Sequence, residues 1–282
     1  MFSLAKILVP IDFSERCLGA ARYAISLVEH FQSELTLLHV VSTVDDLSPE
    51  AAVLNAERRE KAQKALDDFL CAALDHLNTR RILREGDPAE IIIDQAQRDR
   101  SDLIMMPTHG FGPIRRFLLG SVTAKVLHDA PCPVWTGAQL AQGPSREWLA
   151  LRRLACSLDL GPHSASTLRW ANGLAVAYNS ELKILHVVEQ LDPAAQETHY
   201  AHGWRRQLID KASEALAALQ QNEDTHGEAV IEPGNIAEAI AAAALSLEAD
   251  LIIIGRRGTS DRLLGTHAYE IIRRSPRPVV SV

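Results

Sequence analysis

A glycine-rich segment, MMPTHGFGPIRRFLLGSVTAKVL, occupies residues 105–127 and begins with a short apolar run. Glycine has no Cβ, so its backbone can approach a phosphate closely and direct N–H groups at the oxygens. Gly120 and Ser121 open a predicted helix, whose first N–H groups and positive dipole end favour an anion. The segment is therefore either a loop that cradles phosphate or a turn between a strand and a helix, with Ser121 as the helix cap.

Several common motifs of nucleotide-binding and hydrolytic proteins are missing from the sequence. No Gly-Lys pair occurs, which excludes a P-loop, and Arg115 stands where a dinucleotide-binding fingerprint needs its third glycine. No Gly-x-Ser-x-Gly nucleophile elbow occurs. The 4 cysteines are scattered without metal-ligand spacing, and no set of residues offers a nucleophile, a base and metal ligands together. We therefore expect a protein that is not an enzyme and has no metal site.

The composition limits the classes of partner. A formal net charge of −7 gives no electrostatic reason to expect nucleic acid. No apolar run approaches the roughly 20 residues that span a bilayer, and the N-terminal segment lacks the pattern of a signal peptide. Cysteines without a disulfide pattern are typical of reduced thiols in the cytoplasm. We expect a cytoplasmic protein with neither nucleic acid nor membrane as a partner.

The chain repeats itself. The stretch SELTLLHVV at 33–41 agrees at seven of nine positions with SELKILHVV at 180–188, 147 residues later. EGDPAEIII at 85–93 and PGNIAEAIA at 233–241 recur at an offset of 148. A nearly constant offset indicates a tandem duplication. The predicted domains are residues 1–138 and 148–282, joined by a small, polar linker with glycine and proline.

Each half alternates short apolar runs with longer helical patterns. In the first half, strands are predicted at 6–11, 35–41, 80–85, 102–106 and 132–136. Helices are predicted after Ser14 as an N-cap, around residues 50–77, after Pro88 and after Ser121. Strands that alternate with helices indicate right-handed crossovers and a parallel sheet covered on both faces. The predicted fold is α/β: two tandem sandwiches, each with a five-stranded parallel sheet of the Rossmann-like kind.

Several side chains follow the carboxyl ends of these strands, where open α/β sheets bind ligands. Asp12 and Asp159 end the first apolar run of each half. His39 and His186 recur at one position of the second strand, and we interpret them as hydrogen-bonded histidines rather than as catalytic bases. Trp135, in the fifth strand, is interpreted as a packing residue.

These motifs resemble those of tandem universal stress proteins, and the resemblance covers both halves almost end to end. ATP-binding members of that family carry Gly, two residues, Gly, nine residues, Gly and then Ser or Thr after the fourth strand. The first half matches this pattern at Gly110, Gly120 and Ser121 but has Pro107 at the first glycine. The resemblance implies an adenine nucleotide alpha hydrolase-like fold. In this half it also implies adenine contacts from Asp12 and from the backbone of Val40, with phosphate contacts from Gly110, Gly120 and Ser121.

The second half departs from the family pattern differently. Gly255 and Gly258 keep the first turn, but only six residues separate Gly258 from Gly265 and Thr266. By the same resemblance, the implied contacts of this half are Asp159, Val187, Gly255, Gly258, Gly265 and Thr266. Proline offers no N–H to a phosphate, so the first half is expected to bind more weakly than a complete motif. Its correct spacing nevertheless favours the first half, and binding in one half is favoured over binding in both.

The resemblance implies a stress-response protein that binds ATP or a related adenine nucleotide, with or without Mg, and acts as a non-catalytic sensor. The main alternative is an interaction module that has lost nucleotide binding, and the third is an enzyme acting on the nucleotide phosphate. Single-domain members of the family dimerise through the fifth strand. We therefore expect an intramolecular pseudo-dimer, with 133–136 antiparallel to 278–282, that could also form a homodimer.

Overall fold

The computed structural model of the chain describes residues 2–42, 48–108, 119–137, 150–189, 199–256 and 266–282. The chain separates into two compact units, Ser3–Leu149 and Ala150–Val282 together with Met1–Phe2. The tandem arrangement predicted from the repeats is therefore confirmed. The predicted domain ends at 138 and 148 fall at residues 138–149, outside the described part of the chain.

The sheet of the first half has its strands in the order β3-β2-β1-β4-β5. These strands are β1 (Lys6–Ile11), β2 (Glu34–Val41), β3 (Thr79–Glu85), β4 (Leu103–Met105) and β5 (Val134–Thr136). Every neighbouring pair is parallel, and the register aligns Ile11 with His39. Ile7, Leu8 and Val9 are all buried, as expected for a strand covered on both faces. The prediction of a five-stranded parallel sheet is confirmed for this half.

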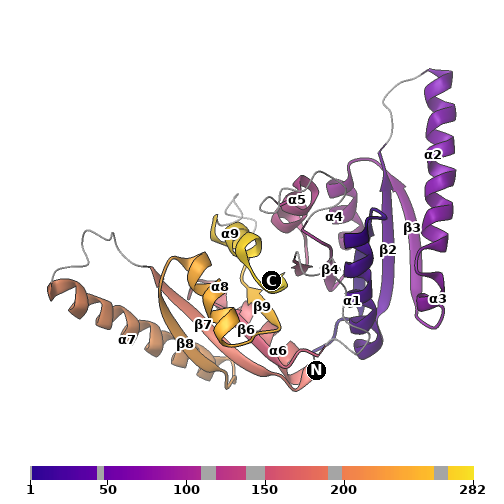
Figure 1. Cartoon of the computed structure of the whole chain (residues 1–282). Coiled ribbons are helices and arrows are strands. Elements are labelled where there is room, and N and C mark those ends of the chain that lie inside the picture. The colour runs from indigo at the N-terminus through magenta and orange to yellow at the C-terminus, as the bar shows by residue number, and fades with distance from the viewer. Residues whose placement is uncertain (1, 43–47, 109–118, 138–149, 190–198, 257–265) are drawn as a thin grey trace. The chain divides into compact units, whose positions relative to one another are not determined.

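The helices of the first half are α1 (Glu15–Phe31), α2 (Pro49–Asp68), α3 (Cys71–Leu74), α4 (Pro88–Asp99) and α5 (Ser121–Asp129). Ser14 caps α1, since its side chain accepts the N–H of Cys17 at 3.2 Å, as predicted. Pro88 begins α4, also as predicted. In Figure 1, α2 lies beside β2 and β3, and its first turns extend past the carboxyl end of β2. Val53 and Leu54 of these turns are 60% and 41% exposed.

The prediction of one long helix around 50–77 is wrong. The chain breaks between α2 and α3, where Phe69 is extended and Leu70 adopts a left-handed φ of +51°. The carbonyl of Phe69 accepts a hydrogen bond from the Arg81 guanidinium at 3.0 Å. The centroid of the Phe69 ring lies 6.0 Å from that of the Phe13 ring. These contacts come from residues distant in the sequence, so the helical periodicity of the segment gave no sign of the break.

The second half repeats the topology, with strands in the order β10-β9-β6-β7-β8. Its strands are β6 (Arg153–Ser157), β7 (Glu181–Glu189), β8 (Glu228–Gly234), β9 (Leu251–Ile254) and β10 (Val279–Ser281). Its helices are α6 (Ser164–Tyr178), α7 (His199–Asn222), α8 (Ile236–Ser246) and α9 (Thr266–Arg274). All its strand pairs are parallel, which confirms the fold class for this half too.

The turn after the third strand has the same conformation in both halves. Gly86 and Gly234 have φ of +136° and +144°, a conformation that only glycine adopts readily. The next residue caps the following helix: the Asp87 side chain accepts the N–H of Glu90, and Asn235 does the same at the start of α8. The turn therefore sends each chain from the carboxyl edge of the sheet directly into a helix.

Most of the buried side chains of each half are aliphatic. Aliphatic burial of this kind is the main favourable contribution to folding. Within the described ranges, no helix is both long enough and apolar enough to cross a bilayer.

Candidate functional site

A cavity of about 470 Å³ opens at the carboxyl edge of the second-half sheet. It lies where the chain leaves β6 toward β7 on one side and later returns through β9 on the other, the switch point at which such sheets bind ligands. Its walls come from the ends of β6, β7 and β9 and from α6 to α9. The residues that line it include Leu158, Asp159, His163, Thr167, His186, Val187, Val188, Glu189, Leu208, Ile236, Gly255, Arg256, His267, Ala268 and Ile271.

Asp159 follows β6 and is held at the cavity by its own turn. One carboxylate oxygen accepts the N–H of Gly161 at 2.8 Å and the hydroxyl of Ser164 at 3.0 Å. Leu160, the next residue, has a left-handed φ of +59°, which costs a residue other than glycine some strain. A carboxylate has about four acceptor positions, so Asp159 can accept further hydrogen bonds on the cavity side.

His186 fixes the neighbouring backbone of β6. Its Nδ1 lies 2.8 Å from the carbonyl oxygen of Leu158, and because a carbonyl only accepts, the ring nitrogen donates. In the first half, His39 Nδ1 lies 2.6 Å from the carbonyl oxygen of Ile11. The interpretation of both histidines as hydrogen-bonded residues at a strand end is confirmed.

The backbone of Val187 faces the cavity. The carbonyl of Leu185 accepts the N–H of Leu158 at 2.9 Å, so the backbone groups of Leu185 point toward β6. Alternate residues of a strand point their backbone groups toward the same neighbour, so those of Val187 also point to that side. Since β6 ends at Ser157, they meet the cavity there rather than another strand.

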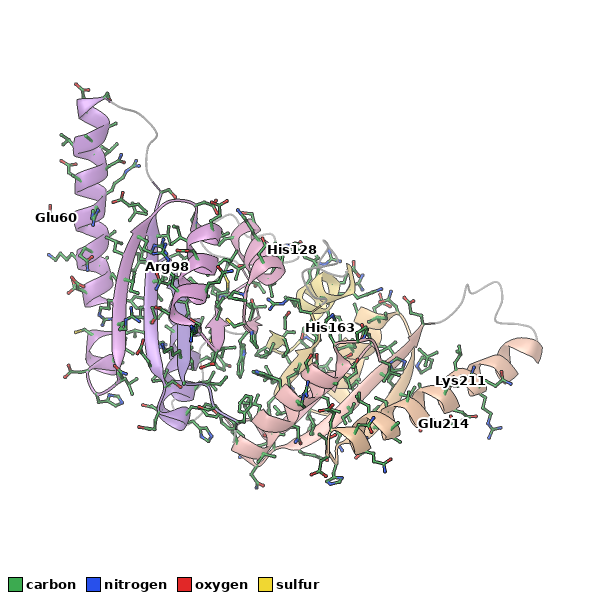
Figure 2. All side chains as sticks on the ribbon, turned by 180° about the vertical axis from the view of Figure 1, so that it is seen from behind. Glu60, Arg98, His128, His163, Lys211 and Glu214 are labelled. Carbon is green, nitrogen blue, oxygen red and sulfur yellow. The ribbon has the colours of Figure 1, made fainter. Side chains whose placement is uncertain are left out.

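Gly255 lies where β9 ends and packs closely against α6. A Cβ at this position would lie 3.0 Å from Thr167 Oγ1, closer than ordinary van der Waals contact. Thr167 is fully buried, and its hydroxyl donates to the carbonyl of His163, the residue before α6 that Figure 2 labels. A larger residue in place of Gly255 would therefore have to displace buried atoms of the cavity wall.

Of the remaining second-half candidates, Thr266 has a described place, at the start of α9. Thr266 is the first residue of α9, and the next residues, His267 and Ala268, line the cavity. Gly258 and Gly265 belong to residues 257–265, outside the described part of the chain. The structure thus brings Asp159, Val187 and Gly255 to one cavity and places the start of α9 beside it.

The first half repeats the hydrogen bonds around its aspartate. Asp12 follows β1, and its carboxylate accepts the N–H of Ser14 at 2.9 Å and the Ser14 hydroxyl at 2.6 Å. Val40 lies in β2, where it pairs with Arg84 of β3. Burial, with a smaller contribution from the charge of Asp12, raises the pKa of the nearby Cys17 thiol to about 12.

Two hydrogen bonds connect the residues before and after the glycine-rich loop of the first half. The N–H of Gly120 donates to the carbonyl of Thr108 at 2.9 Å, and the hydroxyl of Thr123 donates to the carbonyl of Pro107 at 3.1 Å. Gly110 lies at residues 109–118, outside the described part of the chain. The start of α5 is therefore hydrogen-bonded to the carbonyls of Pro107 and Thr108, which follow β4.

The interpretation of Ser121 as the helix cap is wrong. Gly120 occupies the N-cap position with extended backbone angles, and its carbonyl accepts the N–H of Ala124 at 2.8 Å. Ser121 is the first residue of the helix and is exposed. Because a helix begins where its first carbonyl acceptor lies, the hydrogen bond from Ala124 sets the boundary one residue earlier.

Sequence reasoning missed several residues of the cavity. His267 follows the Gly265-Thr266 pair directly, so its place in the first turn of α9 was a signal that could have identified it. Leu208 lies far from every motif and gave no signal, whereas Ile236 belongs to the repeated stretch at 233–241, which could have identified it. Among the residues with described positions, no group of three or more His, Cys, Asp and Glu side chains is arranged to hold a metal ion.

Comparison with known proteins identifies the family. The sequence model of the universal stress protein family matches residues 4–136 and again residues 151–282. The chain therefore belongs to the universal stress protein family, as a tandem two-domain member.

Named relatives agree with this assignment. A universal stress protein of Methanocaldococcus jannaschii is 33% identical over 138 residues, which is 46% of this chain and 79% of the relative. A Thermus aquaticus universal stress protein is 32% identical over 130 residues, 45% of this chain and 94% of the relative. A universal stress protein structure from Archaeoglobus fulgidus covers 99% of this chain and 96% of its own, with a TM-score of 0.70 at 24% identity. That likeness establishes the fold.

Proposed function

We propose that this stress-response protein binds an adenine nucleotide in the cavity of the second half and acts as a non-catalytic sensor of it. The observation that carries this proposal is the meeting of Asp159, Val187 and Gly255 on one cavity, although they come from three different strands. The volume of about 470 Å³ lies within the range of ordinary small-molecule sites, about 300–1,000 Å³.

The β7 side of the cavity suits the base. The backbone carbonyl of Val187 can accept the exocyclic amino group of adenine, and its N–H can donate to a ring nitrogen. Val188, Leu208 and Ile236 contribute apolar surface on which a flat base can pack. Asp159 stands beside them with a carboxylate that can accept the hydroxyls of a ribose.

The β9 side suits the phosphates. Gly255 lets the backbone approach the ligand without a Cβ, and Arg256 follows it on the cavity wall. The first turn of α9 adds the positive end of a helix dipole. A Mg ion that entered with the nucleotide would be held mainly by phosphate oxygens, since Asp159 and Glu189 are the carboxylates on the described lining.

The sequence favours nucleotide binding in the first half because of the spacing between Gly110 and Gly120. Gly110 lies outside the described residues, so this stays a prediction. The second half is proposed because its described residues form a cavity, whereas much of the glycine-rich loop of the first half lies outside the described residues. A cytoplasmic location, a homodimer and the pairing of 133–136 with 278–282 also stay predictions.

The test is isothermal titration of ATP into the full chain, with Asp159→Ala compared against Asp12→Ala. The two aspartates accept similar hydrogen bonds from their own turns, so the pair controls for a loss of turn structure. We expect Asp159→Ala to lower ATP affinity about tenfold or more, and Asp12→Ala to leave it unchanged. The reverse pattern would place the site in the first half.

Melting temperatures of both variants show whether each still folds. No ATP binding by the wild-type chain at millimolar ATP would overturn the proposal and favour an interaction module. The proposal that the protein does not hydrolyse the nucleotide is tested separately, by measuring phosphate release. Phosphate release by the wild-type chain above that of Asp159→Ala would show that the nucleotide is hydrolysed.

A further inference from the structure

We infer that His267 and Arg256 together recognise the phosphate of the nucleotide at the β9 side of the second-half cavity, with His267 binding it as the protonated imidazolium. This inference rests on the proposed function, because it takes the cavity to be a nucleotide site. It identifies the ligand class at that end as a phosphate anion, bound by two cationic side chains whose aligned first-half positions, Val122 and Thr108, carry no positive charge.

The position of His267 supports this role. It is the second residue of α9, it is exposed, and it lines the cavity. Side chains in the first turn of a helix lie near its unpaired N–H groups, which already favour an anion. When the Gly120-Ser121 and Gly265-Thr266 pairs are aligned, the first-half counterpart of His267 is Val122, which has no donor.

Arg256 reaches the same end of the cavity from β9. Its backbone is fixed, since its N–H donates to the carbonyl of Val282 at 2.7 Å and the N–H of Val282 donates to Ile254 at 2.9 Å. Its side chain is half-buried and lines the cavity. A guanidinium pairs readily with two phosphate oxygens, whereas Thr108, its first-half counterpart, carries no charge.

Other charged and titratable groups surround His267. Those on the cavity wall are Asp159, His163, His186, Glu189 and Arg256. On α9 itself, Glu270 pairs with Arg273 at 3.4 Å, and on the adjoining α8, Glu238 pairs with Arg274 at 2.6 Å. These two acids are thus matched by arginines of α9. The carboxylates of the cavity wall belong to the β6 and β7 side, where we place the ribose and base.

A proton on His267 strengthens binding of a phosphate, so bound phosphate in turn favours the protonated ring. Histidine side chains change charge between pH 5 and 8. ATP itself gains a proton near pH 6, so the informative quantity is the difference between the wild-type chain and a His267 variant at each pH.

The experiment is isothermal titration of the full chain with ATP and, separately, adenosine, at pH 6 and pH 8 with EDTA present. The variants are His267→Gln and Arg256→Gln. The control is His128→Gln, a histidine of α5 in the first half that Figure 2 labels. We expect His267→Gln to lower ATP affinity about tenfold at pH 6 and less than about twofold at pH 8.

Arg256→Gln is expected to lower ATP affinity about tenfold at both pH values, because a guanidinium stays charged throughout. Adenosine has no phosphate, so neither variant should change its affinity. Equal losses for ATP and adenosine, or a His267→Gln effect that is the same at both pH values, would overturn the inference. If ATP binding is lost in Asp159→Ala but unaffected by either variant, the proposed function stands and this inference fails. If the wild-type chain binds no ATP, both fail.

Discussion

In the first half, the ring of Phe13 lies 4.5 Å from His39 and 6.0 Å from Phe69, at the end of β1. In the second half, Leu160 takes the place of Phe13 beside a cavity of about 470 Å³. Both residues have a left-handed backbone, with φ of +63° and +59°. Equivalent backbone turns therefore carry different side chains: Phe13 joins an aromatic cluster in the first half, whereas Leu160 follows Asp159, a residue of the cavity wall, in the second.

The two halves share the features that form the carboxyl edge of the sheet and differ in the residues that would contact a ligand there. The aspartate turn and the histidine bond to the strand-end carbonyl occur in both halves. Pro107 and Gly255 then differ at the position where the phosphate of the proposed nucleotide would need a close backbone. Four predictions, from the largest expected effect to the smallest, test how far this comparison holds.

Filling the second-half cavity should have the largest effect. Ala268 is almost fully buried on the cavity wall, and Ala268→Trp would place a large ring in the space that the nucleotide needs. We expect ATP affinity to fall by about 100-fold or more, measured by isothermal titration. The control is Val176→Trp in α6, at a side chain that is 73% exposed, and it should leave affinity unchanged. Unchanged binding in Ala268→Trp would move the site elsewhere.

The glycines after the third strands should differ in their tolerance of a Cβ. Gly86→Ala and Gly234→Ala both force a methyl onto a left-handed backbone, at a cost of about 1–3 kcal/mol of unfolding free energy. A Cβ at Gly86 would also lie 3.2 Å from Ile91, whereas one at Gly234 would meet its nearest neighbour, Ala239, at 3.9 Å. We expect the larger loss in Gly86→Ala by urea denaturation. Equal losses would mean that backbone strain alone decides.

The helix caps after these glycines should respond differently to acid. The N–H of Glu90, with help from Lys125, holds the pKa of the Asp87 carboxyl below its usual value. Its stabilisation is therefore complete above its unfolded pKa, about 4, and is lost as the pH falls through the lower folded pKa. The counterpart Asn235 carries no charge, so its cap should persist at low pH.

Asp87→Ala and Asn235→Ala are each expected to cost about 0.5–1 kcal/mol at pH 7, the lower part of the range for caps, because both sites are exposed. At pH 3 the cost of Asp87→Ala should shrink while that of Asn235→Ala stays. Urea denaturation at the two pH values measures both. A cost for Asp87→Ala that does not change with pH would contradict the role of its charge.

The smallest effect is expected at Cys17, whose second-half counterpart is Ser164. The Cys17 thiol donates to the carbonyl of Pro10 at 3.3 Å, and a serine hydroxyl can make the same bond, so Cys17→Ser should cost less than about 0.5 kcal/mol. Burial and Asp12 raise the pKa of this thiol to about 12, so it stays protonated at pH 8. A thiol reagent at pH 8 should therefore modify the exposed Cys71 and spare Cys17, which peptide mass mapping can check. Rapid labelling of Cys17 would contradict its burial.

Much of the fold could be predicted from the sequence because its signals are local. The Ser14 cap, the start of α4 at Pro88 and the five apolar runs of the first half follow from backbone preference and side-chain period. The repeat at offsets of 147 and 148 carried the same strand pattern to the second half. The break at Phe69 could not be predicted, because a carbonyl bond to Arg81 and an aromatic contact with Phe13 override the helical period.

The candidate site divides in the same way. The sequence by itself identified Asp159 at the end of an apolar run, and the family resemblance of its motifs added Val187 and Gly255. Only the tertiary structure decided that they share one cavity and that Leu208, Ile236 and His267 complete its wall. A strand end is a local property of spacing and residue type. A cavity is the space left between elements distant in the chain, and its shape depends on how all of their side chains pack.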